Sequence, residues 1–303
     1  MINSKHWMVC LDLTKMDSIL IGYVSFLAKI SQPTTVTFLH VVDSGPQTLE
    51  IIEQFPEIES KEEFLDLLRA DIHEKLDESF DEPEAELRVI IKEGKPTNTI
   101  IEVSKSLDFD LLIVGKKTGY VGEGILPKQI LKYVATSILF VPENSRYQLE
   151  NILVPIDFSE QSASATAVAS KLAKISGGAV TAQHIYEYKA QFFPYLMSEE
   201  EMKRVDQKTE DKKNAFLNSY PIPGNVNISL SRHNKGKLAD TVYDKVLNTQ
   251  ADIIIVASKA KRFSALISHD FTDKMVNYAF GVPLLLLRNQ KKYQEYLDDL
   301  FSD

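Results

Sequence analysis

The sequence has only one cysteine, Cys10, among 303 residues, so no disulfide bond can form within the chain. Cys10 lies in an apolar run typical of a strand, where a buried thiol behaves as a small hydrophobic side chain. No run of residues reaches the ~18 consecutive apolar side chains of a membrane span. The first residues lack the basic region and long apolar stretch of a signal peptide. We therefore expect a cytoplasmic protein without a membrane partner.

Neither half of the chain has an excess of basic residues. The formal net charge is −9, and residues 1–148 hold 15 Lys and Arg against 24 Asp and Glu, whereas the remainder holds 19 of each. Proteins that bind nucleic acid need a basic surface to neutralise phosphates, so we expect no nucleic-acid partner. The acid-rich stretch 77–86 is predicted to be a solvated helix end and loop.

The second half of the chain repeats the first at an offset of about 145 residues. Five landmarks recur in the same order: Asp12 and Asp157, His40 and His184, Gly94 and Gly236, Asp110 and Asp252, and Ser137 and Pro283. A fixed period over so many landmarks indicates a duplicated domain.

Each copy alternates apolar β-rich runs with stretches of helical periodicity, which predicts a parallel sheet with helices on both faces. Several runs are nearly continuous in Val, Ile and Leu, as expected of strands buried on both faces. A helix is predicted over 160–176, where apolar side chains recur at helical spacing. Strands are predicted at 6–12, 34–42, 87–93, 110–115 and 137–142, and at 151–157, 179–186, 226–232, 252–257 and 282–287.

Three kinds of segment resemble the universal stress protein family: VPIDFSEQSASA at 154–165, KEGKPTNTIIEVSKSLDFDLLIVG at 92–115, and the closing runs VATSILFVPE and FGVPLLLL. The resemblance covers nearly the whole chain twice. It implies two doubly wound α/β domains of the adenine-nucleotide-hydrolase-like, Rossmann type, each a five-stranded parallel sheet in the order 3-2-1-4-5. We place these tandem domains at 1–143 and 150–290, followed by an amphipathic tail at 291–303. The family also implies intramolecular pairing of the domains, and we expect a homo-oligomer.

In the family, ATP-binding members carry Gly-x2-Gly-x9-Gly-Ser/Thr after the fourth strand, because glycines let the backbone approach phosphate and amides donate to its oxygens. The first copy places Gly115, Thr118, Gly124 and Ile125 at these positions, with Gly122 inside the loop. Its loop is about four residues short of the family's spacing, and Glu123 would lie beside a phosphate. At an effective dielectric constant of ~20, two like charges ~4 Å apart repel by roughly 4 kcal/mol.

The second copy keeps the loop length but places Ala257, Ala260, Asp270 and Phe271 at the four positions. None of them supplies the glycine or hydroxyl that the family uses there. The resemblance therefore predicts a degenerate phosphate loop in both copies and no cofactor; ATP stays possible but is not favoured.

Asp12 and Asp157 match the family aspartate at the nucleoside end of the site. They could contact ribose or adenine, or they could cap the following helix or be a packing relic. Ser159 is predicted to cap the helix that begins near Glu160. His40 and His184 are predicted to be hydrogen-bonded parts of the fold. No cluster has metal-ligand spacing and no catalytic motif follows a strand, so we expect no metal and no enzyme.

Three functions stay open on the sequence alone. The first is a non-enzymatic stress-response protein that acts by binding. The second is a switch that binds or slowly hydrolyses ATP through the first domain. The third is a carrier of a small ligand in the vestigial cleft, with the loop 192–197 either covering the ligand or packing on the domain.

Overall fold

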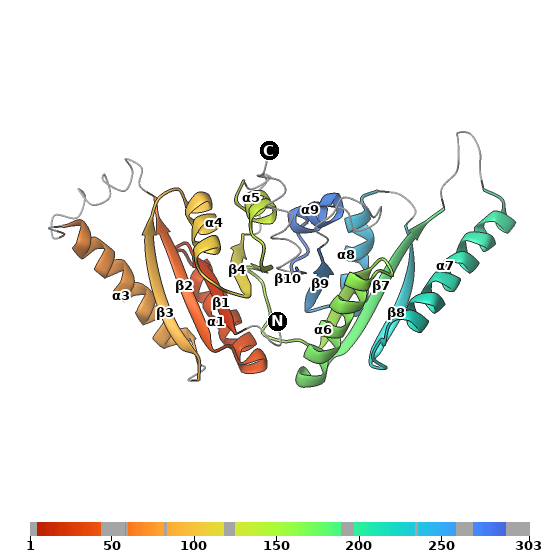
Figure 1. Cartoon of the computed structure of the whole chain (residues 1–303), viewed down its shortest axis with the longest axis horizontal. Helices are drawn as coiled ribbons and strands as arrows, with labels where there is room; N and C mark the ends of the chain where they lie inside the picture. Colours follow the sequence, from red (N-terminus) through yellow and green to blue (C-terminus); the bar gives the residue numbers. More distant parts are fainter. Residues whose placement is uncertain are drawn as a thin grey trace. The chain divides into compact units, whose positions relative to one another are not determined.

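A computed structural model describes residues 5–43, 58, 60–81, 84–117, 125–188, 197–233, 236–258 and 269–288, with the backbone alone for 125–128 and 269–270. The chain folds into two compact units (Figure 1). The first consists mainly of Met1–Tyr147, and the second of Gln148–Phe280 together with Leu284–Leu287.

The first unit alternates strands and helices, as the sequence pattern predicts. Its strands are β1 (His6–Leu11), β2 (Thr35–Val42), β3 (Glu86–Glu93), β4 (Leu111–Lys116) and β5 (Ser137–Pro142). Its described helices are α1 (Met16–Ser31), α3 (Lys61–Ser79), α4 (Pro96–Ser106) and α5 (Ile125–Tyr133).

The second unit repeats this succession. Its strands are β6 (Asn151–Ile156), β7 (Ala179–Glu187), β8 (Val226–His233), β9 (Ile253–Ala257) and β10 (Leu284–Leu287). Its described helices are α6 (Glu160–Ser176), α7 (Glu199–Ser219), α8 (Leu238–Thr249) and α9 (His269–Asn277).

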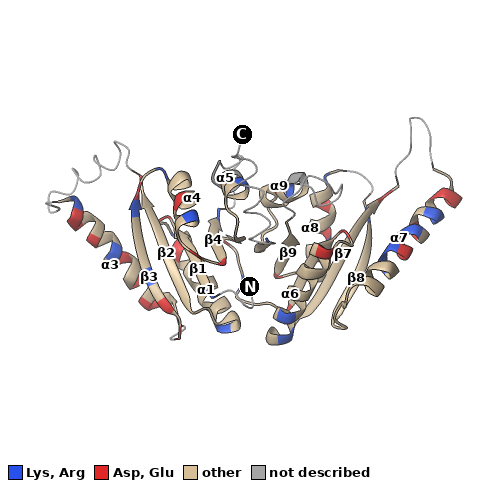
Figure 2. Cartoon of the chain, viewed as in Figure 1, with Lys and Arg blue, Asp and Glu red and all other residues tan. Residues whose placement is uncertain are grey.

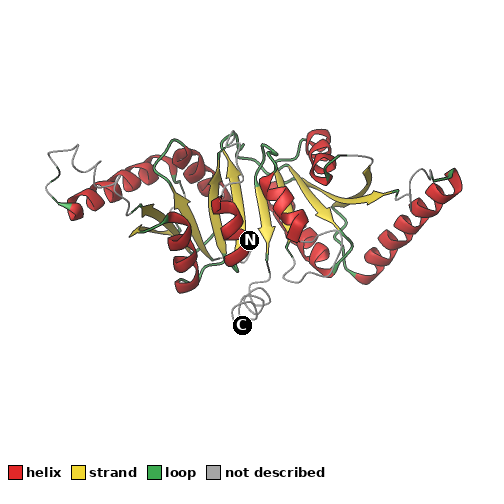
Figure 3. Ribbon diagram, turned by 90° about the horizontal axis from the view of Figure 1, so that it is seen from above, coloured by secondary structure: helices red, strands yellow, loops and turns green. Residues whose placement is uncertain are grey.

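Within each unit the strands run parallel in the predicted order, β3-β2-β1-β4-β5 in the first and β8-β7-β6-β9-β10 in the second. Helices lie on both faces of each sheet (Figure 3). In the first unit α1 packs against α3, and α4 against α5. Every residue of β9 is buried, which explains why its sequence is an uninterrupted apolar run.

The repeated aspartates Asp110 and Asp252 have a structural reason for recurring. The Asp110 carboxylate accepts hydrogen bonds from the backbone N–H groups of Lys5 and His6, at 2.7 and 3.0 Å. Asp252 accepts equivalent bonds from residues 150 and 151, at 2.9 and 3.0 Å. Each carboxylate therefore satisfies donors at the start of its unit's first strand, and it precedes the fourth strand instead of beginning it as the sequence pattern predicted.

Local sequence signals place the helices well. Helix α6 has the predicted bounds, and Ser159 caps it by accepting a hydrogen bond from the N–H of Ser162. Helix α4 begins at Pro96, whose missing N–H is no loss in a first turn. Lys95 is its N-cap residue and follows Gly94, which has a φ of 142°. Strand β10 begins at Leu284, two residues later than predicted, and the residue before it, Pro283, has no N–H to donate to a ladder.

The long helices α3 and α7 carry charged residues along their exposed sides (Figure 2). The acidic residues that end α3 and lead to β3 are solvated, as predicted: Asp77, Glu78, Asp81, Glu84 and Glu86 are all exposed. Only two α3 residues, Ile72 and Leu76, are buried.

Candidate functional site

The candidate site of the first unit lies where the neighbouring strands β1 and β4 end. Ligands of open α/β sheets bind beyond the carboxyl ends of the strands, at the point where the strand order reverses. Asp12 follows β1 directly, and Gly115, Lys116 and Lys117 come at the end of β4. The strand order therefore brings Asp12 and Gly115, two of the predicted site residues, to the same edge of the sheet.

A tight turn fixes the Asp12 side chain. Leu13 has a φ of 56°, which is strained for a residue with a large side chain. The turn allows the N–H and the hydroxyl of Thr14 to donate to Asp12 Oδ1, at 3.2 and 2.6 Å. Lys15 occupies the N-cap position of α1 without a side-chain cap hydrogen bond, and Ser159 caps α6. The hypothesis that Asp12 and Asp157 are N-caps is therefore wrong, and the two carboxylates instead accept hydrogen bonds within the turn before each helix.

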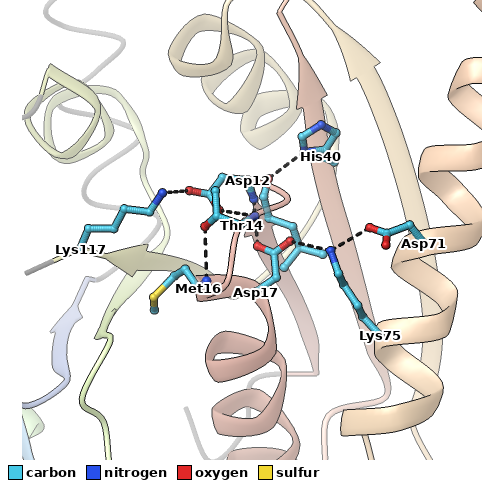
Figure 4. A network of polar contacts seen from close by, with 9 residues as sticks. Asp12, Thr14, Met16, Asp17, His40, Asp71, Lys75 and Lys117 are labelled. Atoms are coloured by element: carbon cyan, nitrogen blue, oxygen red, sulfur yellow. Dashed lines mark hydrogen bonds and ion pairs between the residues drawn. The ribbon is translucent and has the colours of Figure 1, made fainter. Parts of the chain in front are cut away.

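Lys117 holds the second oxygen of Asp12. Its Nζ lies 2.8 Å from Asp12 Oδ2, and the two side chains are 42% and 50% exposed. This ion pair joins the end of β4 to the end of β1 (Figure 4). Partial burial alone would raise the pKa of Asp12, but hydrogen bonds from Lys117 and Thr14 and the charge of Lys117 together lower it. The hydrogen bond to Asp12 likewise raises the pKa of Lys117.

A second carboxylate lies behind the first. Asp17, in the first turn of α1, is 1% exposed, and its Oδ1 accepts the backbone N–H of Asp12 at 3.0 Å. Its Oδ2 lies 3.8 Å from Nζ of Lys75, which also pairs with Asp71 at 2.7 Å (Figure 4). Desolvation raises the pKa of Asp17. Three carboxylates, of Asp12, Asp17 and Asp71, thus lie with the two ammonium groups of Lys75 and Lys117 near the end of β1.

Met16 occupies the space beside Gly115, the first glycine of the family loop. A Cβ on Gly115 would lie 2.8 Å from Met16 Cγ and 3.2 Å from its Cε. Met16 is itself buried. The glycine that the family uses for close approach to phosphate is here in contact with a methionine of the same chain.

In the second unit the Asp157 carboxylate is bound by hydroxyls. Its Oδ1 accepts the hydroxyls of Ser159 and Ser162, at 2.5 and 2.7 Å, and the N–H of Ser159 at 3.2 Å. Phe158, at φ 62°, stacks on His184 with ring centroids 4.0 Å apart. The structure thus brings Asp157 and Ser159 together, as predicted.

The two repeated histidines have the same role in both units. His40 donates from Nδ1 to the carbonyl oxygen of Leu11, and His184 to that of Ile156, both at 3.0 Å. Because a carbonyl only accepts, the proton of each ring is on Nδ1. Burial lowers the pKa of His184. The prediction that both rings are hydrogen-bonded parts of the fold is confirmed.

The end of β9 and the start of α9 are packed. Ala257 is buried in its strand and Phe271 is 5% exposed. The predicted loop positions Thr118, Gly122, Gly124 and Ala260 lie outside the described residues, as do Glu123, most of the 192–197 loop and the tail from 291 onward. The backbone of Asp270 is described, and its side chain is not.

Burial raises the pKa of Cys10 to about 12, so its thiol has little of the thiolate character that redox chemistry needs. Within the described ranges no group of three or more His, Cys, Asp or Glu side chains could hold a metal ion. No described helix is long and apolar enough to cross a membrane.

Lys117, Met16 and Asp17 contribute to this site beside Asp12 and Gly115, and these three were not predicted from the sequence. The position of Lys116 and Lys117 directly after a predicted buried strand was the available signal, because that edge is where α/β proteins gather polar groups. Nothing in the sequence pattern indicates that Met16 contacts Gly115.

The model of the universal stress protein family matches residues 3–138 and again residues 148–288. The chain belongs to the universal stress protein family. The two matches make it a tandem universal stress protein, as the internal repeat predicted, and family membership supports a stress-related binding role. No curated protein gives a significant match.

Solved structures share the fold of this tandem universal stress protein. A functionally unknown protein from Pseudomonas aeruginosa PAO1 aligns with a TM-score of 0.67 and 10% identity, over 100% of this chain and 99% of that chain. A universal stress protein from Archaeoglobus fulgidus aligns with a TM-score of 0.59 and 14% identity, over 94% and 98%. At such identities the likeness concerns the fold alone.

Proposed function

We propose that this universal stress protein acts by binding, without catalysis, and that its own side chains occupy the positions where the family holds a nucleotide. The observation that carries the proposal is the ion pair between Lys117 and Asp12. It spans the two strand ends between which an α/β protein of this topology binds its ligand. A nucleotide would have to separate that pair before it could reach either residue.

Steric and electrostatic features of the first unit support the same conclusion. A phosphate needs the backbone at Gly115 to be open, and Met16 lies against it. The sequence also has Glu123 in the shortened loop, and a carboxylate ~4 Å from a phosphate would oppose it by roughly 4 kcal/mol at an effective dielectric constant of ~20. That repulsion exceeds the ~1 kcal/mol gained from one more neutral hydrogen bond.

In the second unit, too, the chain's own side chains occupy the positions where the family holds a nucleotide, but the residues are different. Asp157 has its Oδ1 engaged by two serine hydroxyls, and buried Phe271 stands where the family has a hydroxyl. Ala257 and Asp270 replace two of the glycines. We propose that this unit is a structural partner of the first, and not a second nucleotide site.

One observation favours a second candidate, an ATP-dependent switch in the first unit. Lys117 is 42% exposed, so its ammonium group could exchange the Asp12 carboxylate for a phosphate. The half-buried neighbour Lys116, whose pKa burial lowers to about 8, would add a second amine at the same strand end. This candidate requires that nucleotide binding depend on Lys117.

Native mass spectrometry of the full chain separates the two candidates. The binding proposal predicts no adenine nucleotide among the co-purified species, whatever other ligand is carried, and the same spectrum reports whether the chain forms the expected homo-oligomer. A mass increment of a bound nucleotide that disappears in a Lys117→Ala variant would establish the switch instead.

A further inference from the structure

A layer of polar side chains lies between strands β7 and β8 and the first turns of α8 in the second unit. The buried Gln183 donates from Nε2 to Ser231 Oγ at 3.0 Å and to the carbonyl oxygen of Thr241 at 3.1 Å. The hydroxyl of Thr241 lies 2.7 Å from Nδ1 of His233. His233 is paired with Glu187 in the β7–β8 ladder, at the carboxyl end of both strands.

His233 is therefore held by one ring nitrogen and faces a carboxylate with the other. Its Nε2 lies 4.0 Å from Glu187 Oε1, too far for a direct hydrogen bond. The side chains are 9% and 37% exposed, so the imidazole is largely buried while the carboxylate reaches solvent. Histidines that bind metal ions are oriented in this way, with the second nitrogen hydrogen-bonded to a neighbouring oxygen.

The separation of the two atoms is close to that of two ligands of one ion. Zinc bonds to His nitrogen and carboxylate oxygen are each about 2.0–2.2 Å, and at a tetrahedral angle they place the two atoms about 3.4 Å apart. A shift of about 0.6 Å by the exposed end of Glu187 would reach that distance. We infer that His233 and Glu187 form a binding site for a divalent transition-metal ion such as Zn²⁺, with Thr241 positioning the imidazole and water completing the coordination.

The pair is particular to the second unit and is not inherited from the duplicated fold. In the first unit the end of the corresponding β2–β3 ladder pairs Val42 with Glu93, which offers no imidazole. The site is also distinct from the strand ends of β6 and β9, because β7 and β8 lie on the other side of β6 in the sheet. The site of His233 and Glu187 supplies two protein ligands, whereas closed structural zinc sites supply four.

The alternative to a metal ion is a proton on His233, which would make an ion pair with Glu187. Calorimetric titration of the full chain with ZnCl₂ in a non-chelating buffer at neutral pH distinguishes the two. We expect one zinc ion that is lost in His233→Ala and weakened in Glu187→Gln. Thr241→Val removes only the hydroxyl that orients the ring and should weaken binding about 10–100-fold.

His6→Ala is the matched control, because His6 is an exposed strand-end histidine whose Nδ1 binds the carbonyl oxygen of Asp108. It should bind zinc like the original chain. Circular dichroism of each variant checks that the fold is retained, and the NMR signals of the His233 ring give a second readout that should shift on adding zinc. Absence of a zinc ion that depends on His233, or a His233 ring that responds to pH and not to zinc, would overturn the inference.

Discussion

The ion pair between Lys117 and Asp12 can be measured by a double-mutant cycle with Lys117→Met, Asp12→Asn and both together. Methionine keeps most of the length of lysine without its charge. Because both side chains are about half exposed, water screens the pair, and we expect a coupling energy of about 0.2–1 kcal/mol. In a domain of this size that corresponds to a change of at most about 4 °C in the melting temperature.

The pH dependence of the coupling follows from the lowered pKa of Asp12. A carboxyl group whose pKa is lower in the folded state stabilises the fold above its unfolded value, which is about 3.9 for aspartate, and loses that contribution as the pH falls through the folded value. Calorimetric unfolding should therefore show the coupling energy at pH 7 and no coupling energy at a pH below 3. Lys116→Met is the matched control, since the Lys116 amine is not part of this pair. The change in melting temperature that it causes should be the same in the original chain and in the Asp12→Asn variant. A coupling energy of zero at pH 7 would show that the two strand ends are not joined in solution.

Three further predictions concern packing and titration. Gly178→Ala should destabilise the second unit by about 3 kcal/mol or more, since its Cβ would lie 2.4 Å from a backbone carbonyl oxygen. Gly177 has open space around it and a φ of 74°, so Gly177→Ala should lower the free energy of unfolding by only about 1–2 kcal/mol. Urea unfolding measures both. Because burial lowers the pKa of His184, its contribution is complete above about pH 6.5 and is lost as the pH falls toward the folded value. The protection of β6 and β7 amides against hydrogen exchange, relative to their intrinsic rates at each pH, should therefore decrease by pH 5, and His184→Gln should remove that pH dependence. Asp17→Ser copies Ser162 of the second unit. The original chain should gain stability relative to this variant as the pH falls through the raised pKa of Asp17 toward the unfolded value of about 3.9, and equal slopes in calorimetry would contradict this.

The elements of the fold could be predicted because each leaves a local signal. Continuous apolar runs mark strands such as β9 that are buried on both faces, and the serine before α6 marks its first turn. Asp110 and Asp252 are one of the five repeated landmarks that revealed the duplication, although their role as acceptors for the chain near β1 and β6 became clear only from the hydrogen bonds. Bounds differ by one or two residues because the last residue of a strand depends on its neighbour's register.

The candidate site was only partly predictable, because its decisive contacts join residues that are far apart in sequence. Lys117 meets Asp12 across 105 positions, and the contact depends on which way the chain leaves β4. Met16 reaches Gly115 through a side-chain rotamer that no sequence period encodes. Asp17 was missed because its carboxylate sits where the second copy has a serine, so the repeat offered no matching landmark.

The central claim is that the chain's own side chains replace a nucleotide at the strand ends, and a calorimetric titration of the full chain with ATP and Mg²⁺ tests it most directly. Ligand at a hundredfold excess over its dissociation constant would stabilise the protein by ~2.7 kcal/mol, a shift of several degrees in melting temperature. We expect no saturable heat up to about 1 mM ATP and a melting shift of under about 1 °C. Saturable binding of one nucleotide per chain that is weakened in Lys117→Met would contradict the account, because it would show that Lys117 leaves Asp12 to bind phosphate.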